Sequence, residues 1–252
     1  MLKNRVIPIL QLNNGDLVKT INFKKHFYLG DPINSVRIFN EKEVDELVFL
    51  DISRDRFQRG PDFKLLENIA SEAFMPFSYG GGISKIEEIR NLMNLGIEKV
   101  IISSYAIENI NFISEAAKLI GSSSLVVSLD INIDIFGKYH ITKFSGTNKV
   151  RIDLFNYVKE LVRNGAGEIL INCIHRDGMM NGYDLEILKK ISSLISLPII
   201  IAGGAGNLLH LKEAIRAGAS AVGGGSFFVL YGKHKAVLIS YPSLEELNSL
   251  YI

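Results

Sequence analysis

Residues 76–82 read Pro-Phe-Ser-Tyr-Gly-Gly-Gly, and residues 198–204, which lie 122 positions later, read Pro-Ile-Ile-Ile-Ala-Gly-Gly. Each stretch is a short apolar run that ends in a glycine cluster, as expected of a buried strand entering a tight turn. The same shift of 122 pairs Glu46 with Glu168, Gly96 with Gly218, and Ser104 with Ser226. Self-similarity at so long a period indicates a duplicated architecture. The chain is therefore predicted to contain two related halves, approximately residues 1–122 and 123–252.

Eight short runs rich in Ile, Val and Leu recur along the chain and predict buried parallel strands. These strands are Arg5–Leu12, Glu46–Ile52, Pro76–Tyr79, Lys99–Ser103, Leu125–Ile131, Glu168–Ile174, Pro198–Ala202 and Ser220–Gly223. Segments with helical periodicity lie between them, namely Ile83–Leu95, Asn109–Ile120, Leu154–Asn164, Asp184–Ile195 and Leu208–Ala217. This alternation favours a single-domain (β/α)8 TIM barrel over residues 1–252, with a doubly wound open sheet as the alternative. Segment 136–150 interrupts the pattern and is predicted to be a hairpin inserted after the fifth strand.

The composition excludes several classes of function. The chain has 28 Lys plus Arg against 27 Asp plus Glu, so it lacks the basic field expected of a nucleic-acid-binding protein. Its apolar runs are far shorter than the ~20 residues of a membrane helix, and its N-terminus lacks the core of a signal peptide. A cytoplasmic location without membrane attachment is expected. The single cysteine, Cys173, excludes an internal disulfide framework and a multi-cysteine metal cluster.

Glycine and serine clusters follow the third and fourth strands of each half. Backbone N–H groups in such loops bind phosphate, especially where a helix begins next to them. The alternative is that each cluster merely forms a tight turn. Because the clusters occur in two symmetric copies, we expect two phosphate sites roughly 20 Å apart across the mouth of the barrel. The predicted site residues are Gly81, Gly82, Ser103 and Ser104 in the first half, and Gly203, Gly204, Gly225 and Ser226 in the second.

Polar residues at the carboxyl ends of the strands are candidates for catalysis. Asp130 ends the fifth strand and could act as a general acid or base, or else only fix a neighbouring loop. Gln11 is the matching group on the first strand, and its amide cannot titrate. Further candidates for substrate binding are Asp51 and Asp177, which are predicted to end strands two and six, Gly178 next to Asp177, and Lys19 in a polar loop after strand one.

Four charged residues are predicted at the opposite, amino-terminal end of the barrel. Arg5, Glu46, Lys99 and Glu168 open strands one, two, four and six, in phase with positions that face the interior. Two cations and two anions could form a closed set of ion pairs, here named the floor ring, which would gate the entry of a small molecule. Alternatively, the four side chains could point into solvent beside the core.

Several of these stretches together resemble the HisF family, the cyclase subunits of imidazole glycerol phosphate synthase. The matching stretches are 5–7, 18–19, 22–23, 30–32, 45–52, 80–83, 165–170, 176–178, 182–184 and 203–206. The resemblance extends over essentially the full length of the chain, and residues 45–52 (Asp-Glu-Leu-Val-Phe-Leu-Asp-Ile) favour HisF over its sister isomerase.

The resemblance implies that a HisH-like glutaminase docks at the amino-terminal face and releases ammonia. The ammonia would pass the floor ring and react at the mouth with a bisphosphorylated ribulosyl nucleotide, with no metal or redox cofactor. The four residues of the floor ring all match the family's gate in type.

One departure from the family bears on the reaction. The family uses two aspartates for cyclisation, and here Asp130 matches one while Gln11 stands at the position of the other. A general acid or base contributes typically ~10²–10⁴-fold to the rate, so its loss favours a HisF-like paralogue over a histidine-pathway cyclase. Members of the paralogue family serve a sugar amidotransferase that makes an acetamidino group on a nucleotide-activated sugar in surface-polysaccharide (lipopolysaccharide O-antigen) biosynthesis.

Three hypotheses for function follow. The leading one is the acetamidino-sugar paralogue, and the second is an ordinary imidazole glycerol phosphate synthase cyclase. The third is an ammonia conduit or scaffold without chemistry of its own, in which Asp130 would be structural.

Overall fold

The computed structural model, which describes residues 4–53 and 55–251, is a closed barrel of eight parallel strands. The strands are β1 (Arg5–Asn13), β4 (Leu47–Asp51), β5 (Phe77–Gly80), β6 (Lys99–Ile102), β7 (Leu125–Ile133), β10 (Glu168–Cys173), β11 (Ile199–Ala202) and β12 (Ala221–Gly224). The barrel closes because β12 pairs in parallel with β1, with Arg5 opposite Ala221, and β10 pairs with β7. This closure confirms the predicted (β/α)8 barrel and excludes the open sheet.

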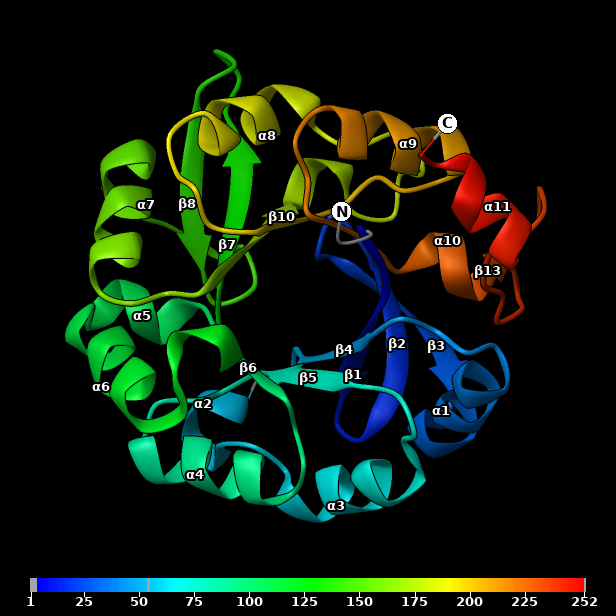
Figure 1. The fold of residues 1–252 in the computed structure, drawn as a ribbon, viewed down its shortest axis with the longest axis horizontal. Helices are drawn as coiled ribbons and strands as arrows, with labels where there is room; N and C mark the ends of the chain where they lie inside the picture. The colour runs from blue at the N-terminus through cyan, green and yellow to red at the C-terminus, as the bar shows by residue number, and fades with distance from the viewer. Residues whose placement is uncertain (1–3, 54, 252) are drawn as a thin grey trace.

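Helices form an outer ring around these strands (Figure 1). The longer ones are α1 (Pro32–Glu41), α3 (Phe63–Glu72), α4 (Ile86–Asn94), α6 (Asn111–Ile120), α7 (Leu154–Arg163), α8 (Leu185–Ser192), α9 (Leu208–Arg216) and the C-terminal α11 (Leu244–Ser249). Shorter turns at strand ends are α2 (Arg56–Arg59), α5 (Ser104–Glu108), α10 (Ser226–Val229) and the 3-10 helices η1 (Ser122–Ser124) and η2 (Ile174–Arg176). The predicted helices are therefore present, each with ends shifted by three residues or fewer.

The two halves use the same local chemistry at the same spacing. Asp31 caps α1 and Asp153 caps α7, each accepting a hydrogen bond from the backbone N–H three residues on. Asp62 caps α3 and Asp184 caps α8 in the same way. The members of each pair are 122 residues apart (153 − 31 and 184 − 62). Such caps satisfy backbone donors that the first helical turn leaves free. The matching caps support our proposal of two related halves.

Three hairpins are added to the barrel. The segment after β7 forms β8 (Tyr139–Lys143) and β9 (Asn148–Lys149), which confirms the predicted insertion; β8 also pairs with the end of β7. A second hairpin, β2 (Asp16–Ile21) with β3 (Lys25–Gly30), lies where the sequence predicted a polar loop. A small third hairpin, β13 (Leu230–Tyr231) with β14 (Ala236–Val237), follows α10.

Two apolar clusters fill the structure. The larger lies between the strands and the surrounding helices, where one face of each strand packs against helical side chains. The smaller fills the barrel interior and contains Ile7, Ile9, Val48, Ile101, Val126, Leu170, Ile200, Ala202 and Ala221. As in other barrels of this size, the interior is packed with side chains. Polar groups are consequently concentrated at the two ends of the barrel.

Candidate functional site

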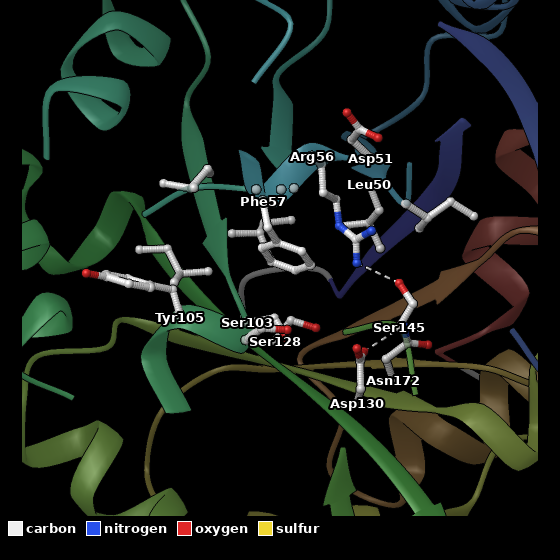
Figure 2. Close-up of a pocket in the computed structure, with 18 of the residues that line it drawn as sticks. Leu50, Asp51, Arg56, Phe57, Ser103, Tyr105, Ser128, Asp130, Ser145 and Asn172 are labelled. Atoms are coloured by element: carbon white, nitrogen blue, oxygen red, sulfur yellow. Dashed lines mark hydrogen bonds between the residues drawn. The ribbon is translucent and has the colours of Figure 1, made fainter. Parts of the chain in front are cut away.

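An open cavity lies at the carboxyl ends of the strands, on the side of the first half-barrel. Most of the predicted catalytic residues and first-half phosphate residues line it: Gln11, Asp51, Gly81, Gly82, Ser103, Ser104 and Asp130. The structure adds Arg56, Phe57, Ser145 and Asn172, which the sequence did not identify as site residues (Figure 2). The cavity thus gathers residues from β1, β4, β5, β6, β7 and β10, as a barrel active site does.

Asp130 lies near the carboxyl end of β7 and faces this cavity. Burial raises the pKa of its carboxyl group to about 6, although the positive charge of Arg56 and a hydrogen bond from Asn172 oppose the shift. Asn172 is opposite Asp130 in the register of β10 and β7, and its Nδ2 donates to Asp130 Oδ1 at 3.4 Å. A carboxyl group with a pKa near 6 can both accept and donate a proton around neutral pH, as a general acid or base requires.

Gln11 is held by the β2–β3 hairpin. Its Oε1 accepts a hydrogen bond from the backbone N–H of Thr20 at 3.0 Å and lies 3.1 Å from Thr20 Oγ1, whose single proton is donated to Asp177 Oδ2 at 2.5 Å. The carboxamide oxygen is thus engaged by the backbone N–H of Thr20, while the amide N–H groups of Gln11 are available to a ligand in the cavity. The residue can therefore serve as a hydrogen-bond donor at the edge of the site.

The first glycine cluster is needed for packing. Gly81 and Gly82 have φ values of +143° and +67°. A Cβ on Gly82 would lie 2.3 Å from the carbonyl oxygen of Arg56, and one on Gly81 would lie 2.6 Å from Asp51 Cβ. The tight-turn interpretation is therefore correct for these two glycines, and their phosphate-binding role stays a prediction. Ser103 Oγ is buried without a hydrogen-bond partner, while Ser104 Oγ accepts from the N–H of Phe144 at 2.9 Å.

The glycine and serine cluster of the second half lies outside this cavity, and an ion pair between Lys19 and Asp177 packs next to it. Lys19 is on β2 and is buried, so its predicted place in an open loop is wrong. Its Nζ donates to Asp177 Oδ1 at 2.6 Å, and its Cε would be 2.9 Å from a Cβ on Gly225. Burial lowers the pKa of Lys19 although Asp177 opposes the shift.

The glycines near the second-half cluster are required by close backbone contacts, and Asp177 lies beyond the end of its strand. β10 ends at Cys173, so Asp177 follows η2 instead of ending the strand directly as predicted. A Cβ on Gly178 would lie 2.6 Å from the carbonyl oxygen of Thr20. Gly203 and Gly204 have φ values of +89° and +113°, and a Cβ on either would meet a backbone carbonyl oxygen within 2.5 Å. Ser226 Oγ, like Ser103 Oγ, is buried and unpartnered.

The floor ring is assembled as predicted at the other end of the barrel. The terminal nitrogens of Arg5 donate to Glu46 and to Glu168. Lys99 Nζ lies 2.8 Å from Glu168 Oε2 and 3.5 Å from Glu46 Oε2. Both carboxylates are buried, which shows that the alternative of side chains pointing into solvent is wrong. Burial works to lower the pKa of Arg5, but attraction by Glu168 and Glu46 outweighs it and raises that pKa above its usual value.

Arg56 is the charged residue among the four lining residues that sequence reasoning missed. Residues 55–59 read Asp-Arg-Phe-Gln-Arg, and this run contains two arginines between a strand and a helix. The structure pairs Arg59 with Asp51, at 2.9 Å, and turns Arg56 into the cavity. Nothing in the local sequence distinguishes the two arginines, because the environment of Arg56 depends on Ser145, which lies far along the chain.

Comparison with known proteins identifies the family. The family described as histidine biosynthesis protein matches residues 5–235. The chain belongs to this family. It is 48% identical over the full length of both chains to a protein of Leptospira interrogans named as a candidate imidazole glycerol phosphate synthase subunit HisF. It is 42% identical to a candidate subunit hisF2 of Pseudomonas aeruginosa, covering 98% of this chain and 99% of the relative.

A third relative, the imidazole glycerol phosphate synthase subunit HisF of Streptococcus mutans, is 38% identical over 84% of this chain and 85% of its own length. The resemblance to HisF is thereby confirmed, and the chain is a HisF-like subunit.

Across the described part of the chain, no helix combines the length and apolar character needed to cross a bilayer. Within the same residues, no three His, Cys, Asp or Glu side chains come together as a metal site would require.

Proposed function

We propose that this HisF-like subunit uses ammonia released by a HisH-like glutaminase docked beneath the floor ring. In this proposal the nitrogen enters between Arg5, Glu46, Lys99 and Glu168 and is used at the mouth, next to Asp130. The ion pairs of the floor ring support this proposal. Their two positive and two negative charges neutralise one another, so the ring closes the amino-terminal end of the barrel without adding a net charge there.

We further propose that the acceptor is a nucleotide-activated sugar on which an amidino group is formed, together with a sugar amidotransferase. The observation that carries this proposal is Gln11, whose carboxamide is fixed by Thr20 in place of the second carboxylate of the cyclase family. Gln11 can donate hydrogen bonds to a substrate but cannot exchange a proton with it. The phosphate groups of the substrate would bind at the glycine clusters, next to Ser103 and Ser226, whose buried hydroxyls have no partner.

The experiment is an assay of the purified chain with the bisphosphorylated ribulosyl nucleotide and an ammonium salt. Release of aminoimidazole carboxamide ribotide is followed beside the Streptococcus mutans relative as a comparator. We expect turnover about 10²–10⁴-fold below that of the comparator, since one general acid or base is missing. Turnover equal to that of the comparator would show that the amidino-sugar proposal is wrong.

An ordinary imidazole glycerol phosphate synthase cyclase is the second candidate function. Asp130 favours it, because a buried carboxyl with a pKa near 6 is suited to acid–base chemistry. The variant Gln11→Asp distinguishes the two candidates, with Gln11→Asn as its matched control. If the site retains the cyclase arrangement in all other respects, Gln11→Asp should raise turnover of the ribulosyl nucleotide and Gln11→Asn should not.

A further inference from the structure

Arg56 is a buried cation without an ion-pair partner. It is 7% exposed, on the short helix α2 at the edge of the cavity. Among residues 4–53 and 55–251, no carboxylate forms an ion pair with it. Its hydrogen bonds go to two neutral groups: Nη1 donates to the carbonyl oxygen of Ser53, and Nη2 donates to Ser145 Oγ at 2.7 Å.

The nearest carboxylates do not compensate this charge by contact. Asp51 accepts hydrogen bonds from Ser53 and is paired with Arg59 at 2.9 Å. Asp130 is near enough for the charges to influence each other but forms no hydrogen bond with Arg56. Burial lowers the pKa of Arg56 in spite of these carboxylates. Burying a charged group is costly unless it is paired, so a guanidinium in this setting requires an explanation.

The position of the guanidinium indicates its role. It lies over the ring of Phe57, 4.3 Å from the centroid, and Figure 2 shows it pointing toward Ser145, above Asp130 and Asn172. Gly82, Ser103 and Asp130 line the same cavity. Two of its five N–H donors are used, which leaves three for a ligand. A guanidinium fork of this kind binds oxyanions through two parallel hydrogen bonds.

We propose that Arg56 is an oxyanion-binding residue of the mouth, which takes a phosphate or carboxylate group of the substrate and supplements the glycine cluster beside it. The proposal goes beyond the proposed function, because it holds whichever acceptor receives the nitrogen. The ligand supplies the negative charge that the protein itself does not place against Arg56.

The absence of tryptophan from the chain allows a direct test. The variant Phe57→Trp places a single fluorescent indole under the guanidinium. Inorganic phosphate is titrated in one series and glucuronate in another, so that the tighter probe identifies a phosphate or a carboxylate as the group bound. We expect a saturable change of fluorescence in at least one series.

In the Phe57→Trp background, Arg56→Gln should weaken binding of that probe at least tenfold, and Arg56→Lys should have a smaller effect. Arg90→Gln is the matched control, since Arg90 is exposed on α4 and pairs with Glu87 alone among the residues that the structure describes. The affinity of this control variant for the probe should be unchanged. Equal affinities in Arg56→Gln and Arg90→Gln, or no saturable signal with either probe, would overturn the proposal.

Thermal unfolding of the chain without the Phe57→Trp change gives a second readout. The bound probe should raise the Tm of wild type and of Arg90→Gln but not that of Arg56→Gln. If Arg56→Gln does not fold, the comparison rests on Arg56→Lys, which keeps the charge and loses the planar fork. A residue with only a structural role would leave the probe-induced rise in Tm unchanged in Arg56→Lys, and that result would also contradict the proposal.

Discussion

At the floor of the barrel two cations and two carboxylates satisfy one another, whereas at the mouth Arg56 and Asp130 line one cavity without forming an ion pair. The floor carboxylates of Glu46 and Glu168 each accept from more than one donor. At the mouth, Arg56 donates two hydrogen bonds to neutral groups and has further N–H groups available, while Asp130 accepts a hydrogen bond from Asn172. The floor charges are thus compensated within the protein, whereas in our proposal the charge of Arg56 is compensated by a bound ligand.

The largest effect is expected from the mouth. Asp130→Asn should reduce nitrogen transfer by about 10²–10⁴-fold in the complex reconstituted with the glutaminase, because the amide cannot accept or return a proton. Transfer is measured with saturating ammonium salt, so that the ammonia supply does not limit the rate. If Asp130→Asn supported transfer as well as wild type, the conduit hypothesis would gain and the catalytic role of Asp130 would be lost.

Breaking the floor ring should lower the stability of the folded protein. Arg5→Ala leaves two buried carboxylates with only Lys99 between them, and we expect the free energy of unfolding to fall by about 3 kcal/mol. Urea unfolding measures this change. The control is Arg37→Ala, which removes an exposed pair with Glu72 and should cost less than about 1 kcal/mol. Equal losses in the two variants would mean that the floor ring is no more than a surface ion-pair cluster.

The raised pKa of Asp130 at the mouth should make the stability of the protein depend on pH. Because burial raises the pKa of Asp130 to about 6, the folded protein keeps a proton there that the unfolded chain releases near pH 4. The free energy of unfolding should therefore fall as pH rises from about 4 to 6, by up to about 3 kcal/mol from this group. Asp130→Asn should lack this contribution, and the difference between its urea-unfolding curves and those of wild type isolates it. Parallel pH profiles for the two proteins would exclude the raised pKa.

The smallest expected effect concerns gating. Lys99→Ala opens the floor ring while Arg5 still bridges Glu46 and Glu168, so the protein should remain folded. Glutamine hydrolysis should be uncoupled from nitrogen transfer, with roughly a tenfold drop in glutamine-dependent transfer and detectable transfer from ammonium salt. The ratio of glutamate released to nitrogen transferred is the measurement. An unchanged ratio would count against a gate.

Much of the fold was predictable because its signals are local or periodic. The strand at 77–80 and the strand at 199–202 are short apolar runs before glycines, and their repetition predicted the barrel. The hairpin at 16–30 was missed because β3 is largely exposed, so its sequence lacks the apolar pattern of a buried strand. Lys19, on the buried strand β2, was misplaced because its burial depends on its partner Asp177, which is 158 residues away.

The sequence by itself determined the barrel, the positions of Asp130 and Gln11, and the four charges of the floor ring, because strand phase fixes which side chains share a face and which end of the barrel they occupy. Only the tertiary structure decided that Lys19 pairs with Asp177, that Gln11 is held by Thr20, and that Arg56 is buried beside Ser145 without a carboxylate partner. These outcomes depend on contacts between distant loops, and the desolvation of a charge is a property of its surroundings that the identity of the residue does not specify.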